Sequence, residues 1–206
     1  MDFDRVGAHD PVTVTGEERE AAIVVPVVSR EDDEAILFTK RADHLSDHPG
    51  QMAFPGGGRE PEDADLLATA LREADEEIGL DPKAVHVVGR LDDIRTVTSY
   101  SVRPFVSRIP DREYYPSDAE VAEIVTLPVA ELTDLENYES EHRDHRHYGE
   151  IRLHFFYVDD YTVWGATAQM LVQLLELGTD WEMPSEPDRY AERGDDLPER
   201  VRDEVR

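Results

Sequence analysis

The sequence LREADEEIGL, residues 71–80, crowds four acidic side chains into five consecutive positions. Three of them, Glu73, Glu76 and Glu77, stand three and four residues apart and therefore share one face of any α-helix that forms here. Like charges at this spacing destabilise a helix by roughly a few tenths of a kcal/mol per pair. Because an acidic helix face is most often a solvated surface, a functional interpretation needs further features nearby.

Those features are a helical apolar pattern and a glycine loop that adjoin the acidic positions. Spacings of three, four and seven residues predict a helix that Asp63 or Asp65 caps and that Gly79 ends. The apolar stripe consists of Leu67, Ala70, Leu71, Ala74 and Ile78. Three consecutive glycines, Gly56–Gly58, lead toward this helix, and Arg72 directly precedes the acidic cluster. Carboxylates on one helix face suit a divalent cation such as Mg²⁺, which would neutralise their crowding.

Periodicity elsewhere predicts a mixed domain with more strands than helices. Apolar runs indicate strands at 21–28, 34–41, 84–91, 97–109, 123–129, 150–158 and 161–164, and helices around 128–135 and at 165–177. This pattern predicts an α+β domain or an α/β/α layered one. We expect a polar segment at 1–20, the domain at 21–177 and a loose acidic tail at 178–206. Pro26 suits an edge or a bulge of the first strand.

Composition excludes several classes of function. The chain has 206 residues, no cysteine and a formal net charge of −27, with a pI near 4.4. Such acidity argues against general binding to nucleic acids or anionic membranes, and the lack of cysteine leaves oxygen and imidazole groups as metal ligands. The longest apolar run, 21–28, is too short to span a bilayer. With no signal-peptide pattern at the N-terminus, we expect a cytoplasmic protein.

Residues 57–80, GGREPEDADLLATALREADEEIGL, resemble the Nudix box, G-x5-E-x7-R-E-U-x-E-E-x-G-U, in which U is aliphatic. The right half of the box matches from Arg72 to Leu80. In the left half, with Gly57 as the box glycine, Asp63 replaces the first glutamate and one extra residue precedes the arginine. The resemblance implies a Nudix-type α/β/α sandwich, with a mixed central sheet and the box helix packed on it.

The segment before the box narrows the resemblance. Residues 36–57 are similar to the signature of coenzyme A pyrophosphatases, roughly L-L-T-x-R-x-x-x-L-R-x-H-x-G-Q-x-x-F-P-G-G. The matching positions are Leu37, Thr39, Arg41, Leu45, His48, Gly50, Gln51, Phe54, Pro55, Gly56 and Gly57, whereas Ser46 replaces an arginine of the pattern. Similar segments follow the box at 96–106, 120–132 and 163–171.

The resemblance implies hydrolysis of the pyrophosphate bridge of coenzyme A or a derivative, with Mg²⁺ or Mn²⁺ as the cofactor. Glu73, Glu76 and Glu77 would hold the metal, and Arg72 would orient them. The general base would be Glu76 or Glu77, or else Glu120 on a later loop. Substrate contacts are expected at Lys40, Arg41, His48, Gln51, Gly56 and Gly57.

Other interpretations remain open. The substrate of a Nudix hydrolase could instead be ADP-ribose, NADH or another dinucleotide, or an oxidised nucleotide. A nucleotide sensor without catalysis is a third possibility, although the intact Arg72 and glutamate set argues against it. A homodimer is one assembly we consider. The stretch HRDHRHYGE (142–150) holds His142, His145 and His147, but it fits no zinc spacing and predicts a solvated hairpin loop.

The acidic composition suggests a protein adapted to a cytoplasm of high salt concentration. Asp and Glu number 48 against 21 Lys and Arg, so the folded chain repels itself at low ionic strength. Near molar salt the Debye length falls to about 3 Å and screens this repulsion. We therefore predict that the melting temperature rises between low and molar KCl, measured by circular dichroism. A melting temperature that stays constant or falls would contradict this hypothesis.

Overall fold

The computed structural model describes residues 1–206 except 31–32, 46, 97–98, 146–148, 193 and 205–206. Its helices are α1 (Phe3–Gly7), α2 (Leu66–Ile78), α3 (Val129–Leu132), α4 (Gly165–Gly178) and α5 (Glu199–Glu204), with 3₁₀ turns η1 (Pro82–Ala84) and η2 (Leu135–Asn137). Its strands are β1 (Arg19–Ser29), β2 (Glu34–Arg41), β3 (Met52–Ala53), β4 (Gly56–Gly58), β5 (His86–Arg90), β6 (Ile94–Arg95), β7 (Tyr100–Ile109), β8 (Val121–Pro128), β9 (Tyr138–His145), β10 (Gly149–Val158), β11 (Tyr161–Trp164) and β12 (Arg189–Ala191).

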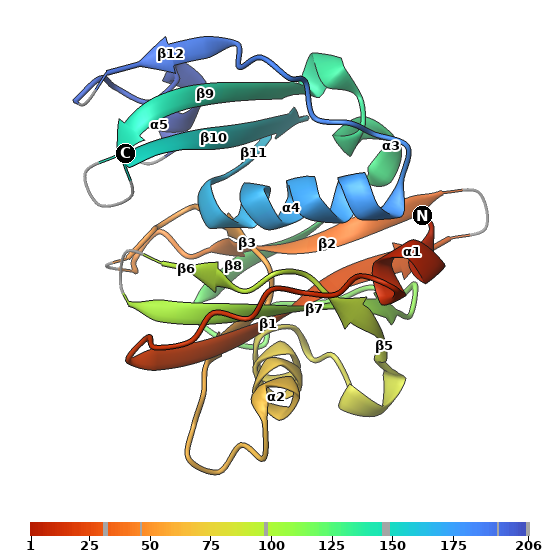
Figure 1. The fold of residues 1–206 in the computed structure, drawn as a ribbon. Helices are drawn as coiled ribbons and strands as arrows, with labels where there is room; N and C mark the ends of the chain where they lie inside the picture. Colours follow the sequence, from red (N-terminus) through yellow and green to blue (C-terminus); the bar gives the residue numbers. More distant parts are fainter. Residues whose placement is uncertain (31–32, 46, 97–98, 146–148, 193, 205–206) are drawn as a thin grey trace.

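The larger sheet is mixed, and β1 lies at its centre (Figure 1). β1 runs parallel to β7 on one side and antiparallel to β2 on the other. β3 pairs with β2, whereas β4 pairs with β1, so the chain between residues 52 and 58 crosses from one strand to the next. Pro26 lies where β1 changes its antiparallel partner from β4 to β2. Because Pro26 has no N–H to donate, it fits this interval, and the expectation of an edge strand is wrong.

Helix α2 forms as the sequence predicts and covers one face of the larger sheet. The Asp65 carboxylate caps it by accepting a hydrogen bond from the Ala68 N–H at 2.8 Å, and Gly79 ends it with a left-handed φ of 63°. The face that packs on β1, β2 and β7 is shifted by about one residue from the predicted stripe. Its buried residues are Leu66, Thr69, Ala70, Ala74 and Ile78, while Leu67 and Leu71 are partly exposed.

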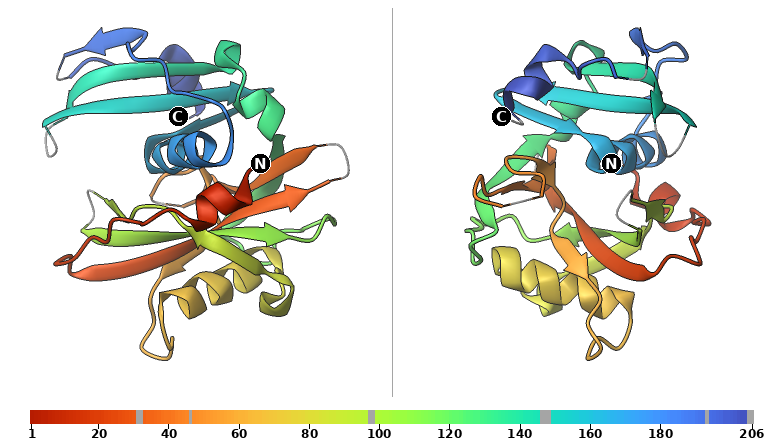
Figure 2. Two further views of the ribbon diagram at one scale, coloured as in Figure 1. Left: turned by 45° about the vertical axis from the view of Figure 1, so that its right-hand side comes forward. Right: turned by 90° about the vertical axis from the view of Figure 1, so that its left-hand side faces the viewer.

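Helix α4 covers the opposite face of the larger sheet and separates it from a second sheet (Figures 1 and 2). The largest apolar cluster joins these layers and includes Val25, Phe38, Phe156, Leu171 and Leu174. The α/β/α sandwich with a mixed central sheet is therefore confirmed. The second sheet, ordered β11-β10-β9-β12, adds a further layer beyond α4. Within it, β10 and β11 agree with the strands predicted at 150–158 and 161–164, and they form a hairpin across Asp159 and Asp160.

Both termini are more ordered than the sequence suggests. After α4, Trp181 is 7% exposed, β12 pairs in parallel with β9, and Val201 of α5 is fully buried against Phe155 and Tyr157. The expectation of a loose tail at 178–206 is therefore wrong for these parts. The segment 1–20, expected to be polar and irregular, contains α1, whose Val6 is fully buried in the main core.

The histidine-bearing stretch is only partly a loop. His142 belongs to β9, where its ring packs edge-on against Tyr190 of β12 at a centroid distance of 5.7 Å. β9 continues to residue 145, so the expectation of a solvated loop is wrong for 142–145. His147 lies outside the described residues. Within the described chain, none of the helices combines the length and the apolar composition needed to cross a membrane.

Burial of His154 in β10 makes folding sensitive to acid. Burial, with a smaller contribution from nearby Arg152, lowers the pKa of His154 to about 4 from its ordinary 6.5. The unfolded chain thus gains a proton as the pH falls through 6.5, whereas the folded chain stays neutral until about pH 4. Stability is full above pH 6.5 and is lost as the pH falls toward 4, by about 2 kcal/mol at pH 5 for this group.

We predict that His154→Gln flattens this dependence, because glutamine does not titrate and can still form a hydrogen bond with the Tyr138 hydroxyl, which lies 2.8 Å from His154 Nδ1. Urea unfolding of wild type and variant at pH 7.5 and pH 5 measures the difference. Equal losses of unfolding free energy in both proteins would contradict the prediction.

Candidate functional site

The glycine strand β4 lies directly against the acidic face of α2. A Cβ atom placed on Gly57 would stand 2.5 Å from Cδ of Glu73 and 2.6 and 2.7 Å from its two carboxylate oxygens. The Glu73 carboxylate therefore occupies the space that any larger residue at position 57 would fill. This contact explains why glycine stands at this position next to a glutamate helix.

Gly56 is needed for a different reason. Its φ of +152° lies in a region that residues with a side chain rarely adopt, and a Cβ there would approach the Ala22 carbonyl oxygen of β1 to 2.4 Å. In this conformation the Gly56 N–H donates to Oε2 of Glu77 at 3.2 Å. The glycine thus lets β4 lie close to β1 while one of its backbone groups holds a site carboxylate.

Arg72 links the helix, the strand and the preceding loop. Its guanidinium donates to both carboxylate oxygens of Asp63 at 3.0 Å and to the Gly58 carbonyl oxygen at 3.1 Å. Its Nη1 also donates to Glu73 at 3.0 Å and to Glu76 at 3.1 Å. The guanidinium therefore holds two of the three glutamates by one nitrogen atom.

The electrostatic environment differs sharply between these acids. The hydrogen bonds from Arg72 hold the pKa of Asp63 well below its usual range, and Asp63 in turn raises the pKa of Arg72. Burial raises the pKa of Glu73 despite the nearby guanidinium. Burial also raises the pKa of Glu77 to about 8, with the Gly56 hydrogen bond opposing the shift and Glu73 adding to it. Two of the helix glutamates are thus desolvated carboxylates with too little positive charge around them.

Arg41 and Glu120 lie beside the same cluster. Nη2 of Arg41 is 3.9 Å from Oε2 of Glu120, and both residues act electrostatically on Glu77, Arg41 lowering and Glu120 raising its pKa. The Ala42 N–H donates to the Glu120 carbonyl oxygen at 2.8 Å, which ties the end of β2 to the loop before β8. The structure therefore brings Arg41, a predicted substrate-binding residue, and Glu120, a candidate general base, close to the glutamates of α2.

Among the remaining predicted substrate-binding residues, Gly56 and Gly57 adjoin the glutamates as described above, whereas Lys40, Gln51 and His48 lie beside other elements. Lys40 belongs to β2, and its Nζ lies 5.9 Å from the ring centroid of Tyr161 in the second sheet. Gln51 Nε2 is 3.6 Å from the Cβ position of Gly165, at the start of α4. His48 is exposed, and its φ of 55° places it at a tight turn of the loop after β2. Ser46 lies outside the described residues.

The donor set of the helix suits a hard divalent cation. Glu73, Glu76 and Glu77 supply carboxylate oxygens, which Mg²⁺ and Mn²⁺ prefer, and two of them carry the burial cost just described. Among the described residues, however, no three acidic or histidine side chains are already gathered into a metal-sized cluster. Glu76 turns to Arg72 and Glu77 turns to Gly56. Side-chain rotation at these glutamates would therefore have to accompany metal binding.

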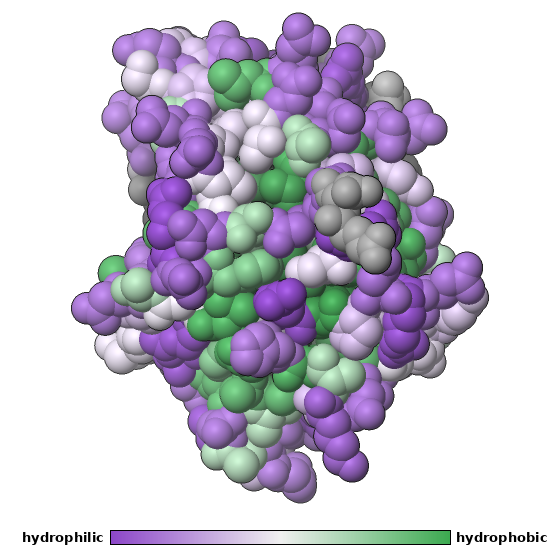
Figure 3. Space-filling model, turned by 90° about the vertical axis from the view of Figure 1, so that its right-hand side faces the viewer, coloured by the Kyte–Doolittle hydropathy of each residue, from purple (hydrophilic) through white to green (hydrophobic). Residues whose placement is uncertain are grey.

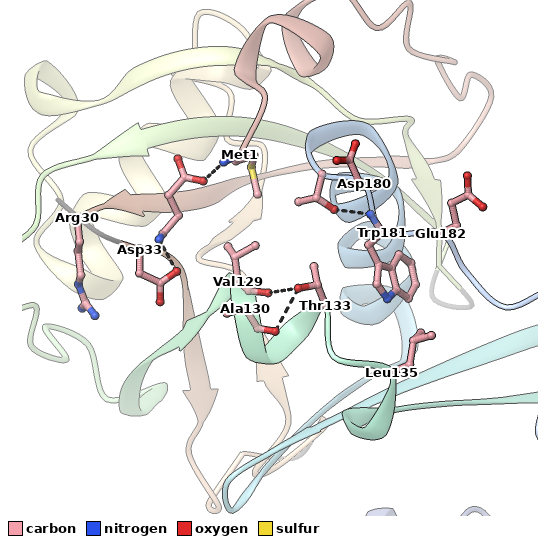
Figure 4. Close-up of a pocket in the computed structure, with 12 residues that line it drawn as sticks. Met1, Arg30, Asp33, Val129, Ala130, Thr133, Leu135, Asp180, Trp181 and Glu182 are labelled. Carbon is pink, nitrogen blue, oxygen red and sulfur yellow. Dashed lines mark hydrogen bonds and ion pairs between the residues drawn. The ribbon is translucent and has the colours of Figure 1, made fainter.

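A cavity of about 1010 Å³ lies away from this cluster (Figure 4). Met1, Glu34, Val129, Thr133 and Trp181 are among its lining residues. The face of the molecule with the N-terminus and α3 shows apolar surface between polar side chains (Figure 3). β2 begins beside the cavity and ends at the glutamate cluster, and a strand of this length separates the two by roughly 20 Å.

Sequence reasoning missed one pair of residues next to β4. Tyr100, at the start of β7, approaches Gly58, and Arg19 of β1 stacks on its ring. The two residues are 81 positions apart. Tyr100 lies in the similar segment 96–106, but Arg19 belongs to no motif, so only the parallel pairing of β1 with β7 reveals the contact.

Comparison with known proteins agrees with the geometry. The NUDIX domain family matches residues 18–151. A protein from Enterobacter sp. (strain 638), named "Uncharacterized Nudix hydrolase NudL", is 41% identical over 165 residues, which cover 78% of this chain and 83% of that protein. The protein of the same name from Cronobacter sakazakii is 42% identical and covers 78% of this chain and 84% of its own length.

This chain belongs to the Nudix family. It is a Nudix hydrolase, and enzymes of this family are pyrophosphohydrolases that bind small nucleotide substrates and generally use divalent metal ions. Among solved structures, a Nudix hydrolase from Alicyclobacillus acidocaldarius aligns with a TM-score of 0.46 at 20% identity, over 60% of this chain and 85% of that one.

Gly57→Ala tests the contact between β4 and the box helix of this Nudix hydrolase. The added methyl group collides with the Glu73 carboxylate, so the glutamate must rotate away while the strand itself can persist. We predict that the affinity for Mn²⁺, measured by isothermal titration calorimetry, falls by about 10- to 100-fold, as for other substitutions that displace metal ligands.

Gly58→Ala is the matched control, because a Cβ there meets nothing closer than Tyr100 at 4.0 Å. Both variants should fold, as judged by circular dichroism, and the control should keep wild-type affinity for Mn²⁺. Equal Mn²⁺ affinity in Gly57→Ala and wild type would contradict the assignment of Glu73.

Proposed function

We propose that this Nudix hydrolase cleaves the pyrophosphate bridge of coenzyme A or a derivative with Mg²⁺ or Mn²⁺ as its cofactor. Hydrolysis of coenzyme A would give 4′-phosphopantetheine and adenosine 3′,5′-bisphosphate. The observation that carries the proposal is the grouping of Glu73, Glu77, Arg41 and Glu120 beside the glycine strand. This grouping brings two glutamates of the Nudix box, Glu73 and Glu77, close to Arg41 of the coenzyme A pyrophosphatase signature.

The reaction needs an attacking water, a stabilised pyrophosphate and an acceptor for one proton. Water oxygen forms a bond to one phosphorus atom while the bond from that phosphorus to the bridging oxygen breaks, and the bridging oxygen leaves on the other phosphate. Glu73, Glu76 and Glu77 would hold the metal. When bound, a divalent metal supplies positive charge against the phosphates and makes water more acidic.

The proton of the attacking water would pass to a carboxylate. We infer Glu76 or Glu77 as the general base, with Glu120 as the alternative. Glu120 is 58% exposed at its side chain and adjoins Arg41, so its carboxylate can reach a substrate that lies over the end of β2. Glu77 is closer to β4, where the glycine backbone lets a pyrophosphate approach.

Basic and amide side chains that could bind the substrate lie on two sides of this site. Arg41 adjoins the glutamates, and we propose that it binds a phosphate of the bridge. Lys40 and Gln51 lie toward the second sheet and α4, where they could bind a more distant part of a long substrate such as coenzyme A. In a protein of net charge −27, basic side chains near a phosphate site are uncommon enough to support this assignment.

A second candidate function is hydrolysis of another nucleoside diphosphate derivative, such as ADP-ribose or NADH. Ser46, which replaces an arginine of the coenzyme A signature, favours this alternative because it removes a possible phosphate contact. A sensor that binds nucleotides without hydrolysis is less compatible with the chain, since Arg72 and all three box glutamates are present.

A substrate panel distinguishes these proposals. The protein is incubated in high KCl with Mg²⁺ or Mn²⁺ and with coenzyme A, an acyl-coenzyme A, ADP-ribose, NADH or dNTPs, and the products are separated by chromatography. We expect coenzyme A or its acyl derivative to be hydrolysed fastest. Intact coenzyme A alongside hydrolysis of another compound would contradict the coenzyme A assignment.

Glu76→Gln tests the role of the box carboxylates in turnover. The substitution keeps the size of the side chain but removes its charge, so we predict that kcat for the best substrate falls at least about 100-fold. Glu136→Gln, at an exposed position of η2, is the matched control and should retain wild-type turnover. Undiminished turnover by Glu76→Gln would contradict the proposed mechanism.

A further inference from the structure

The Arg19 guanidinium lies over the ring of Tyr100 beside the glycine strand. The Arg19 guanidinium carbon lies 4.3 Å from the centroid of the Tyr100 ring, and its Nη1 donates to the Tyr100 hydroxyl at 3.3 Å. The residues face each other across the parallel pairing of β1 and β7. Tyr100 is partly exposed and Arg19 is exposed, so the pair lies at the molecular surface. We refer to Tyr100 and Arg19 together as the stacked pair.

The stacked pair and the glutamates flank β4 from opposite sides. Gly57 has the Glu73 carboxylate where its Cβ would be, whereas a Cβ on Gly58 would point at the Tyr100 ring, 4.0 Å from both Cε1 and the hydroxyl oxygen. Successive residues of a strand face opposite sides of the sheet. A strand of three glycines, with no side chains of its own, is therefore all that separates the aromatic ring from the carboxylates.

Within the larger sheet, β4 lies at the side of β1 next to helix α2. Among the described strands, β4 pairs with β1 alone. Figure 2, right, shows β4 beside α2 and close to the beginnings of β1 and β7. The other edge of β4 faces α2, where the Gly58 carbonyl oxygen accepts from Arg72 and the Gly56 N–H donates to Glu77. A substrate whose pyrophosphate lies at the glutamates therefore meets backbone, and no side chain of β4, as it extends past this strand.

Local backbone geometry holds the ring in place. The Thr96 N–H donates to the Tyr100 carbonyl oxygen at 3.0 Å, and the Tyr100 N–H donates to Oγ1 of Thr96 at 3.1 Å. Ser99, directly before Tyr100, has a φ of +63°, in the left-handed region that a serine adopts only at a cost. Backbone strain of this kind is concentrated at functional sites.

We propose that the stacked pair binds the nucleobase of the substrate. An aromatic ring and a guanidinium plane are the groups on which bases stack. Stacking requires no net charge from the protein, which suits a chain as acidic as this one. The proposal rests on the proposed function, because it takes the pyrophosphate to lie at the glutamate cluster. It assigns Tyr100 and Arg19 a role in substrate affinity, separate from the chemical step.

Tyr100→Ala and Tyr100→Phe test the proposal in the full-length protein, with AMP as the probe for the base site. Loss of one base–aromatic stack typically weakens binding by roughly tenfold or more. We expect Tyr100→Ala to raise the Kd for AMP, measured by calorimetry, and the KM for the best adenine-bearing substrate by this factor. The kcat value should change far less than KM. Tyr100→Phe, which keeps the ring, should remain within about threefold of wild type in Kd.

Tyr190→Ala is the matched control, since Tyr190 is 70% exposed and belongs to β12 of the second sheet. It should bind AMP as wild type does. A Tyr100→Ala protein with wild-type AMP affinity would overturn the proposal, and if its melting temperature also fell, the stacked pair would be only a contact between β1 and β7. Wild-type protein that binds no AMP at millimolar concentration would overturn it as well.

The AMP titration also separates this proposal from the proposed function. If wild type hydrolyses no compound of the panel, the proposed function fails, and the difference in AMP affinity between wild type and Tyr100→Ala still decides the role of the stacked pair.

Discussion

The close approach of α2 to the glycine strand β4 is the constraint on which the site depends. The Glu73 carboxylate fills the space of a missing side chain at Gly57, and Gly56 both approaches β1 and donates to Glu77. A larger residue at position 57 would displace the Glu73 carboxylate, and one at position 56 would meet the backbone of β1. The contact therefore explains together two of the three consecutive glycines, Gly56 and Gly57, and the acidic helix that follows them.

Arg72 makes this close approach electrostatically tolerable. Five hydrogen bonds from one guanidinium group join the helix to Asp63, to the backbone of β4 and to two of the glutamates. Asp63 stands where the Nudix box has a glutamate. Its shorter side chain still accepts two hydrogen bonds from Arg72, so the arrangement is kept. Glu77 is beyond the reach of these bonds, which agrees with its raised pKa and with the need for a further cation.

The sequence predicts the parts of the fold that are encoded locally. The strands β1 and β2 and the helices α2 and α4 come from long apolar patterns with clear ends, and each is present near its predicted bounds. Local sequence does not predict the structure of the terminal segments. The elements α1, β12 and α5 are short, and packing against distant elements holds them in place. Local composition carries little information about such tertiary contacts.

In the candidate site, too, the features encoded by local sequence are predicted, and those that depend on tertiary contacts are not. Spacing alone places the three glutamates on one helix face, and the resemblance to the Nudix box adds Arg72 and the glycines. Two details escaped prediction. Lys40 and Arg41 are neighbours in sequence, but they have different partners, Tyr161 and Glu120, because successive residues of a strand face opposite sides of the sheet. The contact of Arg19 with Tyr100 joins two strands that are adjacent only in the folded sheet.

The most direct measurement of the central claim is an anomalous difference map from a crystal soaked in Mn²⁺. The account predicts a manganese peak in direct contact with carboxylate oxygens of Glu73, Glu76 or Glu77, with the glutamates turned from Arg72 and Gly56 toward the ion. Manganese bound elsewhere, with these carboxylates unchanged at saturating concentration, would contradict the claim that the acidic face of α2 is a metal site.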